Sequence, residues 1–164
     1  MRILGIDPGT IALGYGVIDE REGEISLVAC GALTAPAAMP MSQRLLHLFH
    51  GLRDVIDSYN PDEAAIEEPF VAKNARSALA VGQAIGVATV ALMERGTAVH
   101  HYTPTQVKQA VTSYGRSDKL QVQEMVSLLL NIAELPQPAD ATDALAVAIC
   151  HIQEKRIVRL VTEG

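Results

Sequence analysis

The order of strand-like and helix-like segments is the feature that most constrains the fold of this chain. Three apolar strand-like segments come first, RILGI, GYGVIDE and EISLVACGAL, with turns at Pro8-Gly9 and Glu22-Gly23. Segments with helical periodicity then alternate with two short strands, EAAIE and AVHHY, and further helices follow. The first three strands predict an antiparallel meander. The whole order predicts an α/β fold with a five-stranded mixed sheet flanked by helices.

The predicted helices share apolar residues at helical spacing and a capping or breaking residue at one end. They cover 42–59 with Ser42 as N-cap and Asn60-Pro61 as the end, 75–96 ending at Gly96, 104–114 opened by Thr103-Pro104, 119–132 capped by Ser117, and a last segment after Pro138. Residues beyond His151 form only a brief tail.

Length and composition fit one compact domain over residues 1–164. The chain has 164 residues, is 49% hydrophobic, and contains no Pro- or Ser-rich stretch that would separate two domains. Its start enters a turn without the long apolar region of a signal peptide, so a cytoplasmic location is expected. Cys30 and Cys150 form no CxxC pair, which predicts two reduced, buried thiols.

Four carboxylates lie in surroundings that otherwise look like hydrophobic core. Asp7 closes the first strand, Glu67 closes EAAIE, and Asp140 and Asp143 open the apolar segment DATDALAVAIC. Strand ends and a helix start are rigid, so these acids can converge on one point. A spacing of three places Asp140 and Asp143 on one helical face. Oxygen ligands without a His or Cys cluster predict a site for Mg²⁺, with Mn²⁺ as the alternative ion.

Simpler interpretations exist for each part of this pattern. Either Asp140 or Asp143 alone is more often a helix-start residue, which the helix dipole favours. The small residues after Asp7 let a phosphate approach the backbone, but sugar kinases and actin-like ATPases hold nucleotide phosphates with a similar Asp-x-Gly-Thr hairpin. The hairpin alone therefore leaves a nuclease and a nucleotide phosphotransferase open.

The net charge of −6 at first argues against a nucleic-acid partner. The charges are unevenly distributed, however. Residues 70–120 hold six basic and two acidic residues, a net charge of +4, whereas the rest of the chain holds seven basic and seventeen acidic residues, a net charge of −10. The basic segment predicts contacts with phosphates, and a solvated surface is the competing interpretation.

Five separated motifs stand together in order: GIDPGT with GYGVI, AIEEPF with AKNARSAL, GQAIGVA, QVKQAV, and DATDALAVAI. With these motifs the chain resembles the RuvC-type Holliday junction resolvases, bacterial endonucleases with a ribonuclease H-like fold, from Arg2 to about His151. The resemblance implies a homodimer that binds four-way junction DNA and nicks two strands of like polarity in recombination and repair. It also implies, generally, a branch-migration complex of the RuvA and RuvB type.

The resemblance also assigns roles to individual residues. The family's catalytic acids fall on Asp7, Glu67, Asp140 and Asp143, which would hold two Mg²⁺ ions at the scissile phosphate. Its active-site lysines match Lys108 and Lys119, and its base-stacking aromatic matches Phe70. The candidates for DNA binding are therefore Phe70, Lys73, Arg76, Lys108, Arg116 and Lys119. For the lysines a solvated helix face, and for Phe70 ordinary packing, are the alternatives.

Two other functions remain to be weighed. An actin-like phosphotransferase needs two such domains and a second phosphate loop, for which the chain is too short. A catalytically inactive junction-binding protein would be expected to lack one of the acids, and all four are present. Period-two alternation predicts that Glu67 shares a sheet face with Ala65, whereas Glu68 lies on the side of Ile66 or leaves the strand.

The five histidines receive no role from the sequence. His47 and His50 are three residues apart but lack a third ligand at suitable spacing. His100, His101 and His151 stay unassigned. The run ALAVGQAIGVATVA has the small residues of a close helix contact, which fits either a dimer interface or a core helix.

Overall fold

The computed structural model describes residues 1–69 and 74–163. Phe70 and Lys73, two of the predicted DNA-binding residues, lie outside them. The elements, in chain order, are β1 (Arg2–Asp7), β2 (Ala12–Arg21), β3 (Glu24–Thr34), α1 (Met41–Tyr59), β4 (Glu63–Glu67), α2 (Ala75–Glu94), β5 (Ala98–Tyr102), α3 (Pro104–Thr112), α4 (Lys119–Leu130) and α5 (Ala139–Glu163). The predicted five-stranded mixed sheet flanked by helices is confirmed.

The sheet has the strand order β3-β2-β1-β4-β5. The first three strands form the predicted antiparallel meander, and β4 and β5 add in parallel to the β1 edge. In the β1–β4 pairing Ile6 lies opposite Ile66, so both strands end at the same edge of the sheet. That shared edge brings the carboxyl ends of two strands, which are 60 residues apart in the sequence, next to each other.

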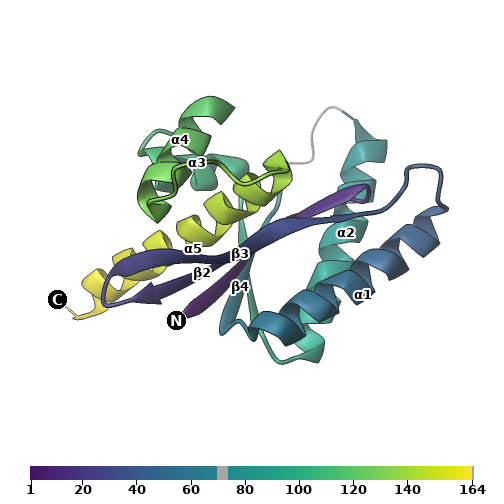
Figure 1. Ribbon diagram of the computed structural model, residues 1–164, viewed down its shortest axis with the longest axis horizontal. Helices are drawn as coiled ribbons and strands as arrows, with labels where there is room; N and C mark the ends of the chain where they lie inside the picture. The colour runs from purple at the N-terminus through teal and green to yellow at the C-terminus, as the bar shows by residue number, and fades with distance from the viewer. Residues whose placement is uncertain (70–73, 164) are drawn as a thin grey trace.

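Helices cover both faces of the sheet. Figure 1 shows α1 and α2 on one side and α3, α4 and α5 on the other. Two clusters of buried side chains fill the two interfaces. Within β4, Ala65 belongs to the cluster beneath α3–α5 and Ile66 to the cluster beneath α1 and α2, as period-two alternation requires. The face that Ala65 shares with Glu67 is therefore the one covered by α5.

Glycines on β1 and β2 allow α5 to pack directly on the sheet backbone. A Cβ atom at Gly14 would lie 2.1 Å from the carbonyl oxygen of Asp140, and one at Gly5 would lie 2.1 Å from the carbonyl oxygen of Ala144. Neither distance is sterically allowed, so these positions require glycine for close approach rather than for backbone freedom. This contact sets the depth at which the first turn of α5 lies over the sheet.

We predict that Gly14→Ala destabilises the protein by about 1–3 kcal/mol or more, because the added methyl group meets backbone that cannot rotate away. The same displacement moves the first turn of α5 away from the ends of β1 and β4. Urea unfolding monitored by circular dichroism measures the loss. An unchanged unfolding midpoint would contradict the close contact described here.

Three expectations about local structure were wrong. Ser42 is not an N-cap, because α1 begins one residue earlier, after Pro40, without a side-chain cap. Ser117 does not cap α4: Asp118 does, in a reciprocal capping box with Gln121, while the Ser117 hydroxyl bonds within the preceding turn. Cys30 is only partly buried, whereas Cys150 is buried as predicted.

Candidate active site

The two strand-end acids lie side by side at the edge shared by β1 and β4. Asp7 is the last residue of β1 and Glu67 the last residue of β4. α5 crosses this edge, and its first two turns carry Asp140 and Asp143. Asp143 lines the same cavity as Asp7 and Glu67, and Asp140 is close enough for its charge to act on Asp7. The four predicted acids thus lie around one point, brought there by three separate elements.

The cavity at this point has a volume of about 230 Å³ and combines charged and apolar walls. Its charged side chains are Asp7, Glu67, Asp143, Lys108 and Lys119. The apolar wall comes from α3, α4 and α5, with Pro104, Val107, Val122 and Ala146. An apolar wall lowers the local dielectric constant, which strengthens every electrostatic interaction in the cavity.

The pKa of Asp7 is raised from its ordinary value of 3.8 to about 7. Burial is the largest cause, and the negative charges of Glu67, Asp143 and Asp140 add to it, while Lys119 acts in the opposite direction. Burial and the charge of Asp143 likewise raise the pKa of Glu67. Carboxylates held this close repel one another, and a cation bound between them would relieve that repulsion.

Among the residues that the structure describes, two lysines supply the positive charge of the cavity. Lys119 is the first residue of α4, and its Nζ donates a hydrogen bond to Asp143 Oδ2 at 2.8 Å. That bond is the largest cause of the raised pKa of Lys119. Lys108 projects from α3 into the same cavity, and its charge lowers the pKa of Glu67, against the larger effect of burial. Two lysines do not balance four carboxylates.

The donor set fits a hard divalent cation. Carboxylate oxygens are the preferred protein ligands of Mg²⁺ and Mn²⁺, and the described residues of the cavity wall include neither His nor Cys, which a zinc site would favour. Within the described part of the chain, the acids around the cavity outnumber its lysines. Asp7, Glu67, Asp140 and Asp143 are therefore the residues that would hold the metal.

Arg76 and Arg116, the other predicted DNA-binding residues that the structure describes, lie outside the cavity wall. The side chains of Arg76 and Arg116 are exposed, near the start of α2 and in the loop before α4. Glu68, adjacent to Glu67, faces away from the cavity. Its carboxylate lies 3.5 Å from His101 Nδ1 and is 59% exposed.

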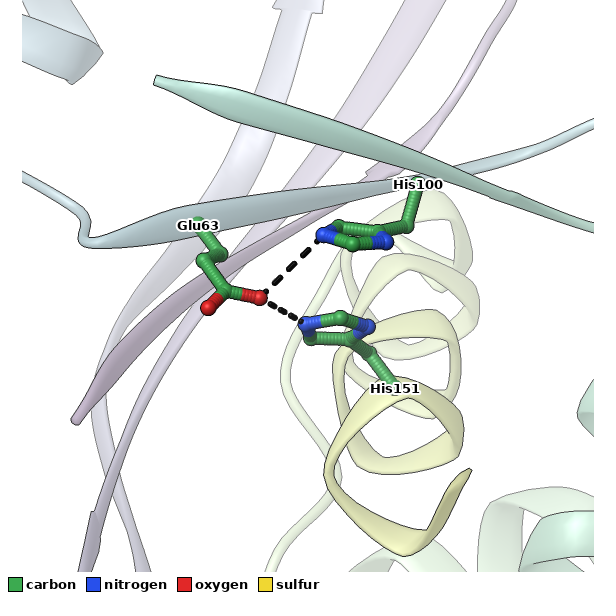
Figure 2. A group of neighbouring side chains, drawn as sticks. All are labelled: Glu63, His100 and His151. Carbon is green, nitrogen blue, oxygen red and sulfur yellow. Dashed lines mark hydrogen bonds and ion pairs between the residues drawn. The ribbon is translucent and has the colours of Figure 1, made fainter. Parts of the chain in front are cut away.

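Sequence reasoning missed one cluster of ionisable side chains on the same sheet face. Glu63, His100 and His151 converge at the other end of β4 (Figure 2). Tyr102 contacts His151, and Lys155 contacts Glu63. The available signal was period-two spacing, which places Glu63 on the same strand face as Glu67, and His100 on the same strand face as Tyr102. This spacing would predict that Glu63 and His100 lie on one sheet face only if the pairing of β4 with β5 were already known.

A mixed sheet with acids at the ends of two parallel strands, completed by acids of a crossing helix, defines a ribonuclease H-like protein with a candidate metal-dependent nuclease site. The sequence family described as crossover junction endodeoxyribonuclease RuvC matches residues 3–151. The chain belongs to this family.

Individual relatives agree with that assignment over nearly the whole chain. The crossover junction endodeoxyribonuclease RuvC of Chloroflexus aurantiacus is 55% identical over 151 residues, which are 92% of each protein. The protein of the same name from Dehalococcoides mccartyi is 50% identical over 164 residues, 100% of this chain and 99% of the relative. The structure of T. thermophilus RuvC in complex with Holliday junction substrate superimposes with a TM-score of 0.91 at 33% identity, covering 96% of each chain.

Proposed function

We propose that residues 1–164 form one nuclease domain that resolves four-way DNA junctions by paired, metal-dependent nicks in recombination and repair. The observation that carries the proposal is the convergence of Asp7, Glu67 and Asp143 in one cavity with Lys108 and Lys119. Membership of the RuvC family and the likeness to a RuvC bound to a Holliday junction support the substrate. We place this activity in the cytoplasm.

The chemistry follows from the charges in the cavity. Two Mg²⁺ ions per site would activate a water molecule and stabilise the leaving oxygen of the phosphodiester. Mn²⁺ would substitute for Mg²⁺ in both roles. The metal would be held by Asp7, Glu67, Asp140 and Asp143. Lys108 and Lys119 place positive charge beside the phosphate, in a cavity that has one apolar wall. No nucleophilic side chain is needed.

DNA binding is assigned to the basic residues around the cavity. Lys108 and Lys119 contact the phosphate that is cut, and the exposed Arg76 and Arg116 contact phosphates farther along the junction arms. Phe70 stacks on an unpaired base and Lys73 adds a further phosphate contact in this proposal. A branch-migration complex of the RuvA and RuvB type would supply the junction.

A mobile synthetic junction incubated with Mg²⁺ tests the function, with a linear duplex of the same sequence as control. We expect symmetric paired nicks on the junction and none on the duplex. Equal cutting of both substrates would contradict selectivity for junctions. A complete lack of cutting with Mg²⁺ and with Mn²⁺ would contradict the proposed nuclease.

Helix α2 supports a homodimer. Among the described helices it is the one long and apolar enough to cross a membrane by length and composition, and only 22% of its apolar window is buried. Leu79, Val90 and Met93 are 68%, 60% and 59% exposed. A groove between α1 and α2 continues this apolar surface with Leu46, Phe49 and Val87. α2 packs on a sheet that carries a charged active site, which argues against a membrane as the cover of its apolar surface. We therefore propose that a second copy of the chain covers the exposed face of α2.

We predict that Val90→Lys converts the dimer to a monomer. The substituted charge would be buried without a partner at the interface, which weakens association by about 100-fold or more. Sedimentation equilibrium of the variant and of Val158→Lys measures this, since Val158 is similarly exposed, at 58%, near the end of α5. Monomerisation by Val158→Lys but not by Val90→Lys would move the interface away from α2.

A further inference from the structure

Three side chains of different elements point their ligand atoms at one place on the α5 side of the sheet. Figure 2 shows the imidazoles of His100, on β5, and His151, on α5, next to each other, with the carboxylate of Glu63, on β4, facing both. Glu63 Oε2 lies 3.2 Å from His100 Nε2 and 2.8 Å from His151 Nε2. The three atoms all lie within 4.8 Å of one another. Two imidazole nitrogens and one carboxylate oxygen thus face a common centre.

This cluster is separate from the acid cavity. Glu63 begins β4 and Glu67 ends it, about 13 Å apart along an extended strand. His151 follows Asp143 by eight residues, about 12 Å along α5. The two clusters share a strand and a helix and no side chain.

Neighbouring groups hold the cluster in place. The Tyr102 hydroxyl and His151 Nδ1 share a hydrogen bond of 2.7 Å, which directs Nε2 of the same ring toward Glu63. Lys155 donates to the other carboxylate oxygen of Glu63, Oε1. The His151 side chain is 1% exposed, whereas that of His100 is 42% exposed, so the centre is closed on one side and reaches solvent on the other.

The electrostatics leave the ligand atoms in suitable forms. Burial by itself raises the pKa of Glu63, but the hydrogen bonds from Lys155 and His151 outweigh it, and the net pKa is lowered. Burial lowers the pKa of His151 in spite of the carboxylate beside it. An ionised carboxylate and neutral imidazole are the ligand forms that metal ions bind.

From this geometry we infer that Glu63, His100 and His151 form a second metal site, for a transition-metal ion of the Zn²⁺ class. With bonds of about 2.0–2.1 Å in tetrahedral geometry, ligand atoms are about 3.3–3.4 Å apart. The 3.2 Å separation would widen by about 0.1–0.2 Å and the 2.8 Å separation by about 0.5–0.6 Å. Each imidazole would bind the ion through Nε2 in the neutral form that carries its proton on Nδ1, and the Nδ1–H of His151 would donate to the Tyr102 hydroxyl oxygen. The hydrogen bond between the Tyr102 hydroxyl and Nδ1 fixes the orientation of the His151 ring, as hydrogen bonds to metal-binding histidines commonly do.

Ligand chemistry separates the two sites. The acid cavity offers oxygens alone and suits Mg²⁺, whereas two imidazole nitrogens favour Zn²⁺, Co²⁺ or Ni²⁺. A bound ion joins β4, β5 and α5, the helix that carries Asp140 and Asp143. Its role is to cross-link the elements that position the acids, independently of the chemistry in the acid cavity.

The test uses Co²⁺ as a spectroscopic probe and Zn²⁺ as competitor. The protein carries Asp7→Asn and excess Mg²⁺ is present, so that the acid cavity does not contribute. We expect one Co²⁺ per chain, with visible absorption of a four- or five-coordinate site that Zn²⁺ displaces. Zn²⁺ is expected to raise the melting temperature by about 5–10 °C at concentrations far above its Kd.

Two adjacent histidines provide a matched pair of variants. His100→Gln should weaken Co²⁺ binding by about 100-fold or more and abolish the Zn²⁺-dependent shift, and Glu63→Gln should do the same. His101→Gln should change neither, because His101 points to the opposite sheet face, toward Glu68. If the parent binds no Co²⁺, or if His100→Gln binds it as tightly as His101→Gln does, the three side chains form only a hydrogen-bonded cluster and the inference is wrong.

Discussion

Asp7→Asn is expected to reduce Mg²⁺-dependent cleavage of a four-way junction by roughly 1,000-fold or more while the variant still binds the junction. The substitution removes a ligand charge with little change of shape, and charge stabilisation by a bound metal contributes several kcal/mol to phosphodiester hydrolysis. Binding is retained because the basic residues around the cavity are unchanged. Single-turnover cleavage and a gel-shift titration on one labelled junction measure the two effects.

The same variant should make the metal-free protein more stable above pH 7. Asp7 binds its proton more tightly in the folded chain, with a pKa of about 7 against an ordinary 3.8. The parent's free energy of unfolding therefore has a contribution that is present below pH 4 and lost as pH rises to about 7. Asparagine does not titrate, so this contribution does not change with pH in the variant. At pH 8 in EDTA the free energy of unfolding of Asp7→Asn should therefore exceed that of the parent by up to about 4 kcal/mol.

Urea unfolding of both proteins at pH 4 and pH 8 tests this pH dependence. The difference should be small at pH 4, large at pH 8, and reduced again when Mg²⁺ stabilises the parent. A variant that is less stable than the parent at pH 8 would contradict the repulsion among the four acids. Wild-type-like cleavage by the variant would contradict the assignment of Asp7 as a ligand.

Glu67→Gln and Glu68→Gln are expected to differ by roughly 1,000-fold in cleavage rate, although the residues are adjacent. Glu67 ends β4 inside the cavity, with a pKa raised first by burial and then by the charge of Asp143. The Glu68 backbone N–H still bonds to the Tyr102 carbonyl, but its side chain is 59% exposed beside His101. Glu67→Gln should lose a metal ligand, while Glu68→Gln loses only a surface charge.

Each variant is the other's control, because both make the same chemical change in the same strand. Single-turnover rates on one junction, at several Mg²⁺ concentrations, should show Glu67→Gln inactive throughout and Glu68→Gln within about threefold of the parent. Junction affinity of Glu68→Gln should be equal or slightly tighter, since a negative charge is removed near DNA. If Glu68→Gln is inactive and Glu67→Gln is active, the metal ligand is Glu68 and the assignment of Glu67 is wrong.

Local patterns in the sequence predicted the elements and the identity of the acids. Period-two alternation in EAAIE depends only on residues within one strand, and it placed Glu67 on the face of Ala65, opposite Ile66, as the structure has it. The preference of Asp and Glu carboxylates for Mg²⁺ is likewise a property of the residue types, so it can be inferred without knowledge of the fold. The helix caps were less secure, because Ser117 and Asp118 compete for the same role and the capping box with Gln121 decides between them.

What only the tertiary structure decided are the contacts between residues far apart in the chain. Asp7 meets Glu67 because β4 adds in parallel beside β1, and Asp143 reaches both because glycine at positions 5 and 14 lets α5 rest on the sheet backbone. Glu63, His100 and His151 were individually unremarkable in the sequence. They meet because β4 pairs with β5 under α5, and a side chain's own pattern specifies its face of a strand or helix but not which other element packs against that face.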